Sequence, residues 1–184
     1  MDIAGIIKTR WSPRAFSDHS INSNEAQLLF EAARWAPSSM NEQPWKYYYV
    51  FKEDSEKFKL FLDCLKPGNQ VWAKHASMLI LSTAKKNFDY NGKINRHAMH
   101  DTGAANVLLC LQANAMGYQA HQMGGFKPEV TFKSLDIDND KYDLVSFIAV
   151  GKPGDPASLP DDLRKSEIKP RERKTLSKMV RRMK

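Results

Sequence analysis

Residues 98–116, AMHDTGAANVLLCLQANAM, form the stretch around which the rest of the chain is organised. Apolar and small residues recur in it at helical spacing, with Ala105, Leu108, Leu109 and Gln112 in register, and Gly117 follows where a helix would end. The stretch therefore predicts the longest helix of the protein, in a central position.

Segments on both sides of this helix predict strands. Residues 77–83 and 144–151 are short apolar and β-branched runs, and residues 47–51 are rich in aromatic side chains. The other predicted elements are a helix from the capping box at 22–25 to Pro37, an amphipathic helix over 58–65 before Pro67-Gly68, a short helix near 128–135 and an acidic loop over 136–143. This order predicts a mixture of α and β structure.

The composition fits one globular domain over residues 1–184, with 42% hydrophobic and 27% charged residues. The longest apolar runs fall far short of the roughly 20 residues that a membrane span requires. The N-terminus shows no basic leader followed by a cleavage site, so a cytoplasmic protein is expected. Cys64 and Cys110 lie far apart without a CxxC motif and are predicted to be buried, unreactive thiols.

The net charge of +7 is concentrated at the end of the chain, because residues 164–184 are rich in Lys and Arg. From Lys152 onward prolines are frequent and apolar residues are sparse. A segment with so little to bury would not order alone. We therefore predict that residues 152–184 form an extended arm that packs on a second subunit.

Two guanidinium groups and a hydroxyl group occur within five residues near the start of the chain, at Arg10, Ser12 and Arg14. Arginine side chains form paired, charge-assisted hydrogen bonds with phosphate oxygens, and a Ser hydroxyl or a backbone amide can complete the cradle. The cluster is a candidate phosphate site, and a solvated surface loop is the alternative.

Two further segments are candidates for contact with a ligand. APSSMNEQPW, residues 36–45, places amide and hydroxyl side chains between prolines, which lower the entropy cost of holding them against a flat heteroaromatic ring. Gly124 and Gly125 let the backbone approach a ligand closely or adopt positive φ. A helix-to-strand connector and a simple turn are the respective alternatives.

The motifs R-x-S-x-R-x-F, A-P-S-x-x-N-x-Q-P-W, D-x-G-A-A-x-x-x-L and G-G-F begin at Arg10, Ala36, Asp101 and Gly124. In this order and spacing they resemble the FMN-dependent nitroreductase family, over residues 6–180. The resemblance implies an α+β fold with a mostly antiparallel central sheet flanked by helices. It also implies an intertwined homodimer with FMN sites at the interface.

The resemblance further implies roles for particular residues. The phosphate and ribityl chain would be held near the start of the chain, joined by two arginines from the arm, and the Gly124 amide would face the flavin N5. Residues 37–41 would contact the flavin from the other subunit. The cofactor-binding set implied is Arg10, Trp11, Ser12, Arg14, Pro37, Ser38, Ser39, Asn41, Gln43, Met123, Gly124, Gly125, Arg171 and Arg173.

The activity implied is that of an oxidoreductase that takes hydride from NADH or NADPH. It would pass the hydride to small electron-poor acceptors, such as nitro compounds or quinones, by a ping-pong mechanism. No side chain is predicted to be catalytic, because FMN carries the chemistry. No G-x-G-x-x-G motif lies between a strand and a helix, so no dedicated dinucleotide domain is expected. Reductive dehalogenases and oxidases on the same scaffold are alternatives.

Two other interpretations are less favoured. His97, His100 and His121 lack the HExxH pattern and a carboxylate on the same helix face, so no metal site is predicted. The basic tail could bind nucleic acid in a protein without flavin. The expected partners are instead a second copy of the chain and a small-molecule acceptor, with no nucleic acid and no membrane.

Overall fold

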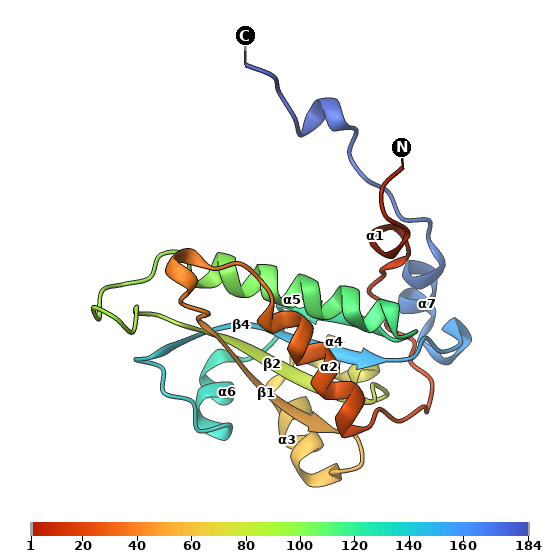
Figure 1. Ribbon diagram of the computed structural model, residues 1–184. Helices are drawn as coiled ribbons and strands as arrows, with labels where there is room; N and C mark the ends of the chain where they lie inside the picture. The colour runs from red at the N-terminus through yellow and green to blue at the C-terminus, as the bar shows by residue number, and fades with distance from the viewer. Residues whose placement is uncertain (1, 184) are drawn as a thin grey trace.

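A computed structural model describes residues 2–183 of the protein (Figure 1). Within these residues a four-stranded sheet has the order β1-β2-β4-β3, and all neighbouring strands are antiparallel. The strands are β1 (Trp45–Phe51), β2 (Met78–Lys85), β3 (Gln119–Met123) and β4 (Tyr142–Gly151). The prediction of a mostly antiparallel central sheet is confirmed.

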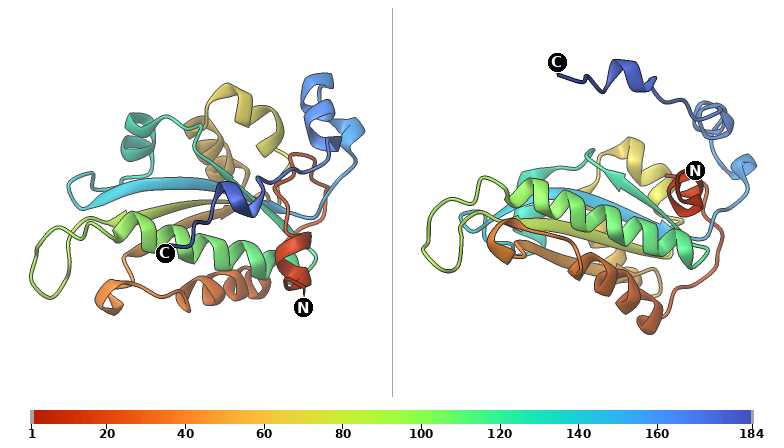
Figure 2. Two further views of the ribbon diagram at one scale, coloured as in Figure 1. Left: turned by 90° about the horizontal axis from the view of Figure 1, so that it is seen from above. Right: turned by 45° about the horizontal axis from the view of Figure 1, so that its top comes forward.

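Helices cover both faces of this sheet (Figures 1 and 2). The helices are α2 (Ser23–Arg34) and α5 (Ala98–Ala115) on one face, and α3 (Ser55–Cys64), α4 (Pro67–Ala73) and α6 (Pro128–Ser134) on the other. Alternate residues of a strand point to opposite faces, so Ile80 packs with α2 and α5 while Leu79 and Leu81 pack with α3. The central strands are therefore buried on both sides.

Local sequence signals explain where the principal helices begin and end. The predicted capping box is present at the start of α2, where the Asn22 side chain accepts from the Glu25 amide and the Glu25 side chain accepts from the Asn22 amide. The central helix α5 is followed by Gly117 with φ of +78°. Both predicted boundaries are confirmed.

A buried polar network fixes α5 on the sheet. The Asn106 side chain has no exposed surface, and its Oδ1 accepts from the Tyr47 hydroxyl at 3.0 Å. Its Nδ2 donates to Ser82 Oγ at 2.9 Å and to Ser146 Oγ at 3.2 Å. The Asn106 Nδ2 also donates to Gln122 Oε1 at 3.3 Å, so all four strands supply partners to one amide. The network therefore specifies how α5 is rotated about its axis.

Several elements differ from the sequence prediction. The edge strand β3 has polar residues along most of its length and was not predicted, and neither was the five-residue helix α1 (Gly5–Thr9), which buries no side chain. Pro67 begins α4 instead of separating helix from loop, since the first helical turn tolerates proline. Tyr142, expected in the acidic loop, already belongs to β4.

The C-terminal segment has two parts. Its first part, with η2 (Pro156–Ser158) and α7 (Asp161–Ile168), returns to the N-terminal end of the chain (Figure 2). Its second part, residues 169–183 with η3 (Leu176–Lys178), is exposed. Arg171 binds the backbone of Arg10 and Lys8, and the chain beyond it leaves the body (Figure 1). Arm packing on a second subunit thus stays a prediction for the second part, whereas the first part also packs on its own chain.

The structure also bears on the predictions for the two cysteines and for a membrane span. Cys64 and Cys110 are buried and free, and burial raises the pKa of Cys110 to about 11, which keeps the thiol protonated. Among residues 2–183 no helix has the length and apolar character needed to cross a membrane.

Candidate functional site

The N-terminal loop, residues 10–16, lies along the edge strand β3. The Arg10 guanidinium donates to Ser12 Oγ at 3.1 Å. The Trp11 amide donates to Gln119 Oε1 at 2.9 Å, and His121 Nδ1 lies 2.9 Å from the Pro13 carbonyl oxygen. The loop is thus held by side chains of β3, a strand that sequence patterns did not reveal.

His121 is a neutral hydrogen-bond donor to this loop. Burial is the main cause that lowers its pKa, with a smaller contribution from the Arg14 guanidinium, while the Pro13 carbonyl raises it in part. Its ring stacks on Trp72 with 4.6 Å between ring centroids. A neutral ring with Nδ1 protonated donates to the Pro13 carbonyl, which fixes the tautomer.

Residues from the C-terminal segment reach the same loop. The Arg171 guanidinium donates to the carbonyl oxygens of Arg10 and Lys8, at 2.6 and 2.8 Å. Arg173 lies close by and lines a cavity of about 270 Å³ together with Lys8 and Arg171. The structure therefore brings basic groups from the two ends of the chain together.

A buried carboxylate of α7 also holds the loop. Glu167 is 4% exposed, and its Oε1 accepts from the amides of Arg14 and Ala15, at 2.7 and 3.0 Å. Its Oε2 lies 3.9 Å from Arg14 Nη1. The sequence does not single out Glu167, because nothing local pairs it with residues 14 and 15.

The Gly124-Gly125 turn follows β3 at the far end of the strand from Trp11. Neither glycine has positive φ, so the lack of a side chain matters here because it lets other groups come close to the backbone. The Gly125 carbonyl accepts from the Lys66 amide and the Asn69 side chain, and a Cβ on Gly125 would lie 2.6 Å from Asn69 Nδ2. Among residues 2–183 the Gly124 amide has no acceptor, and the space around this exposed residue is open. Met123 next to it is buried.

The second polar loop, residues 37–43, is strained. Met40, Asn41 and Gln43 have φ between 51° and 56°, a backbone conformation that residues other than glycine rarely adopt. The Gln43 amide donates to Ser38 Oγ at 3.0 Å, and the Ser39 amide donates to Asp101 Oδ2 at 2.9 Å. Such strain persists where surrounding contacts enforce it, as is typical of functional sites. Pro37, Asn41 and Gln43 are exposed.

The two loops lie at opposite ends of α5 (Figure 1). Asp101 at the start of the helix binds Ser39, whereas Asn114 near its end donates to the Ile6 carbonyl and to Thr9 Oγ1, next to the N-terminal loop. The helix rises about 20 Å between Asp101 and Asn114. Within one protomer, the residues predicted to contact one flavin therefore form two separate clusters.

Comparisons with known proteins agree on one relationship. A model of the nitroreductase family matches residues 7–66 and 55–152. A crystal structure described as an oxidoreductase containing FMN is 35% identical, with a TM-score of 0.91 over 98% of this chain and 91% of that chain. Protein DrgA of Synechocystis is 30% identical over 83% of this chain and 84% of its own length. An oxygen-insensitive NADPH nitroreductase of Helicobacter pylori is 25% identical over 80% and 85%.

Proposed function

Because the chain belongs to the nitroreductase family, we propose that it is an FMN-dependent oxidoreductase that uses NADH or NADPH to reduce small electron-poor acceptors, such as nitro compounds or quinones. The Gly124 amide carries the proposal. It is exposed at the end of an edge strand, has open space around it, and has no acceptor among residues 2–183. A donor in this state fits the edge of a flat heteroaromatic ring.

When bound, FMN supplies N5, the atom that accepts and returns hydride, so that the two substrates react in turn by a ping-pong mechanism. The protein binds and orients this group. Arg10, Ser12 and Arg14 are suited to the phosphate, because guanidinium groups form charge-assisted hydrogen bonds with its oxygens. Arg171 and Arg173 add positive charge from the second part of the C-terminal segment.

The strand β3 offers a path from the phosphate cluster to Gly124. His121 lies beside Pro13, and Gly124 follows it three positions later, a distance of about 10 Å along an extended strand. A ribityl chain can run along this edge, between Trp11 at one end and the turn after Met123 at the other. The arginine cluster and the Gly124 amide then bind the phosphate end and the ring end of one FMN molecule.

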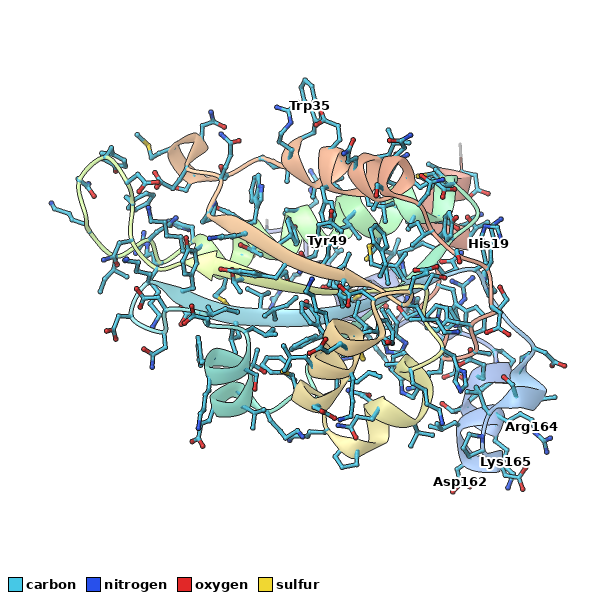
Figure 3. All side chains as sticks on the ribbon, turned by 90° about the horizontal axis from the view of Figure 1, so that it is seen from below. His19, Trp35, Tyr49, Asp162, Arg164 and Lys165 are labelled. Atoms are coloured by element: carbon cyan, nitrogen blue, oxygen red, sulfur yellow. The ribbon has the colours of Figure 1, made fainter. Side chains whose placement is uncertain are left out.

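A homodimer would complete the site. Met99 and Val107 on the outer side of α5 are 46% and 48% exposed, and Trp35 points outward from the end of α2 at 73% exposed (Figure 3). Apolar side chains on both sides of a helix favour burial against a second copy. Two α5 helices packed antiparallel about a two-fold axis would bring residues 37–43 of one copy to the N-terminal loop of the other.

The first test is an absorption spectrum of the purified protein from about 300 to 550 nm, before and after anaerobic NADH and then NADPH. The expected result is a flavin band that one or both nucleotides bleach. A colourless protein that also fails to take up added FMN would refute the proposal. The acceptor class is tested by adding a nitro compound or a quinone to the bleached protein under argon: return of the band supports it, and a band that neither compound restores contradicts it.

A further inference from the structure

We propose that Glu167 is a positioning residue that shapes the N-terminal loop for the phosphate group of the cofactor. The inference rests on the proposed function, since it assumes that a phosphate binds beside Arg10 and Arg14. Its basis is the contact between α7 and the loop, which joins the two ends of the chain at the candidate phosphate site.

One oxygen of Glu167 controls the backbone of the loop. Oε1 accepts from two successive amides, those of Arg14 and Ala15, and thereby fixes the peptide group between them. The other oxygen lies 3.9 Å from Arg14 Nη1, on a side chain that keeps 30% of its surface exposed. A single carboxylate thus sets the position of the Arg14 backbone and places a negative charge near its guanidinium, while part of the Arg14 side chain stays exposed.

The choice of a charged residue at this position is costly for stability alone. Glu167 is the buried residue of α7, and its side chain is 1% exposed. Burying a carboxylate without a close ion pair is costly before hydrogen bonds offset it, and an apolar side chain would avoid that cost but leave the amides of Arg14 and Ala15 without an acceptor. The carboxylate is explained by what it holds, namely two amides and one guanidinium.

The strand β3 also holds the N-terminal loop, so Glu167 determines the shape of the loop at residues 14 and 15 alone. Gln119 and His121 of β3 hold Trp11 and Pro13. Glu167 holds the next two residues, and the Gly154 amide donates to the Ala15 carbonyl at 2.9 Å. Loss of the Glu167 contacts therefore releases the amides of Arg14 and Ala15 and the Arg14 guanidinium, and leaves the other contacts of the loop in place.

The test compares FMN with riboflavin, which has the same ring but no phosphate. Affinities of the full-length apoprotein for both flavins are measured by quenching of flavin fluorescence. We expect Glu167→Ala to weaken FMN binding about 10-fold or more, on the scale of a hydrogen bond to a charged group, and to change riboflavin binding by less than about twofold. Asp162→Ala, on the outward side of the same helix (Figure 3), is the matched control and should leave both affinities unchanged.

A conservative variant separates positioning from general stabilisation. Glu167→Gln keeps a carbonyl oxygen that can accept from both amides, so FMN affinity should return to within about threefold of the unaltered protein. Equal losses for FMN and riboflavin in Glu167→Ala, no loss for either, or a Gln variant as weak as the Ala variant would overturn the inference.

If Glu167→Ala does not fold, Glu167→Asp gives the same comparison, because its shorter side chain keeps the charge but withdraws the oxygen from the amides. An FMN-selective loss supports the inference, and an unchanged ratio of the two affinities overturns it. An unaltered protein that binds neither flavin would instead refute the proposed function, so the two failures are distinguishable.

Discussion

Gly154→Ala tests how closely the C-terminal segment packs on the N-terminal loop. A Cβ at position 154 would lie 2.5 Å from the carbonyl carbon of Phe16, 2.6 Å from its oxygen and 2.8 Å from the amide nitrogen of Ser17. All three are backbone atoms, so no side-chain rotation can relieve the clash. Moving the two segments apart would also lengthen the hydrogen bond from the Gly154 amide to the Ala15 carbonyl.

The expected magnitude follows from these contacts. Overpacking costs about 1 to 3 kcal/mol, and the weakened backbone hydrogen bond adds about 1 kcal/mol. We therefore expect the free energy of unfolding to fall by about 2 to 4 kcal/mol. Gly154 does not have positive φ, so the cost is steric and not conformational.

The assay is urea unfolding of the apoprotein, followed by far-UV circular dichroism. With a slope of about 1 to 3 kcal/mol per M, the midpoint for Gly154→Ala should fall by about 0.7 M or more. Gly68→Ala is the matched control: Gly68 is exposed, lies in α4 and has no atom within 4 Å of an added Cβ, so alanine should be neutral or stabilise by up to about 1 kcal/mol. Equal unfolding free energies for the two variants would refute the packing argument.

Three other predictions concern the site and the core. Arg10→Ala and Arg173→Ala should each weaken FMN binding by about 10- to 100-fold, and a flavin titration that gives the unaltered affinity for both would remove the phosphate assignment. Asn106→Leu should lower the free energy of unfolding by about 2 to 3 kcal/mol, because buried hydroxyl groups lose their partner; a change below about 0.5 kcal/mol in urea unfolding would contradict this. Burial holds the pKa of His121 below its ordinary 6.5, so the unfolded chain binds a proton first as the pH falls, and stability is lost below about pH 6.5. Urea midpoints measured from about pH 7.5 to 5 should fall more steeply for the unaltered protein than for His121→Gln, and parallel curves would be inconsistent with a buried neutral ring.

Much of the fold could be predicted from local signals in the sequence. The capping box at Asn22, the apolar run of β2 and the helical spacing around Leu109 each act within a few residues, so they could be recognised in the sequence. The strand β3 could not be recognised, because its polar residues serve the N-terminal loop and its backbone pairs with β4, more than twenty residues away in sequence.

The candidate site, too, could be predicted only where its signals are local. Arginine and glycine motifs marked the N-terminal loop and the turn at Gly124 by their chemistry. The contacts that hold these segments, from Glu167 to Arg14 and from Asp101 to Ser39, were not predicted, because each joins positions far apart in the chain. Long-range contacts of this kind leave no periodic pattern in a single sequence.

The hydrogen bonds of Glu167 and Arg171 with the N-terminal loop affect the order in which parts of the chain can fold during synthesis. Translation proceeds from the N-terminus, so residues 10–16 are made first, yet the groups that hold them come from β3 and then from the last fifth of the chain. The sheet and its helices can form before α7 is made, whereas the N-terminal loop gains the Glu167 and Arg171 contacts only after that later segment has left the ribosome. A product that ends before α7 would therefore lack the acceptor for the amides of Arg14 and Ala15 and the Arg171 contacts with residues 8 and 10.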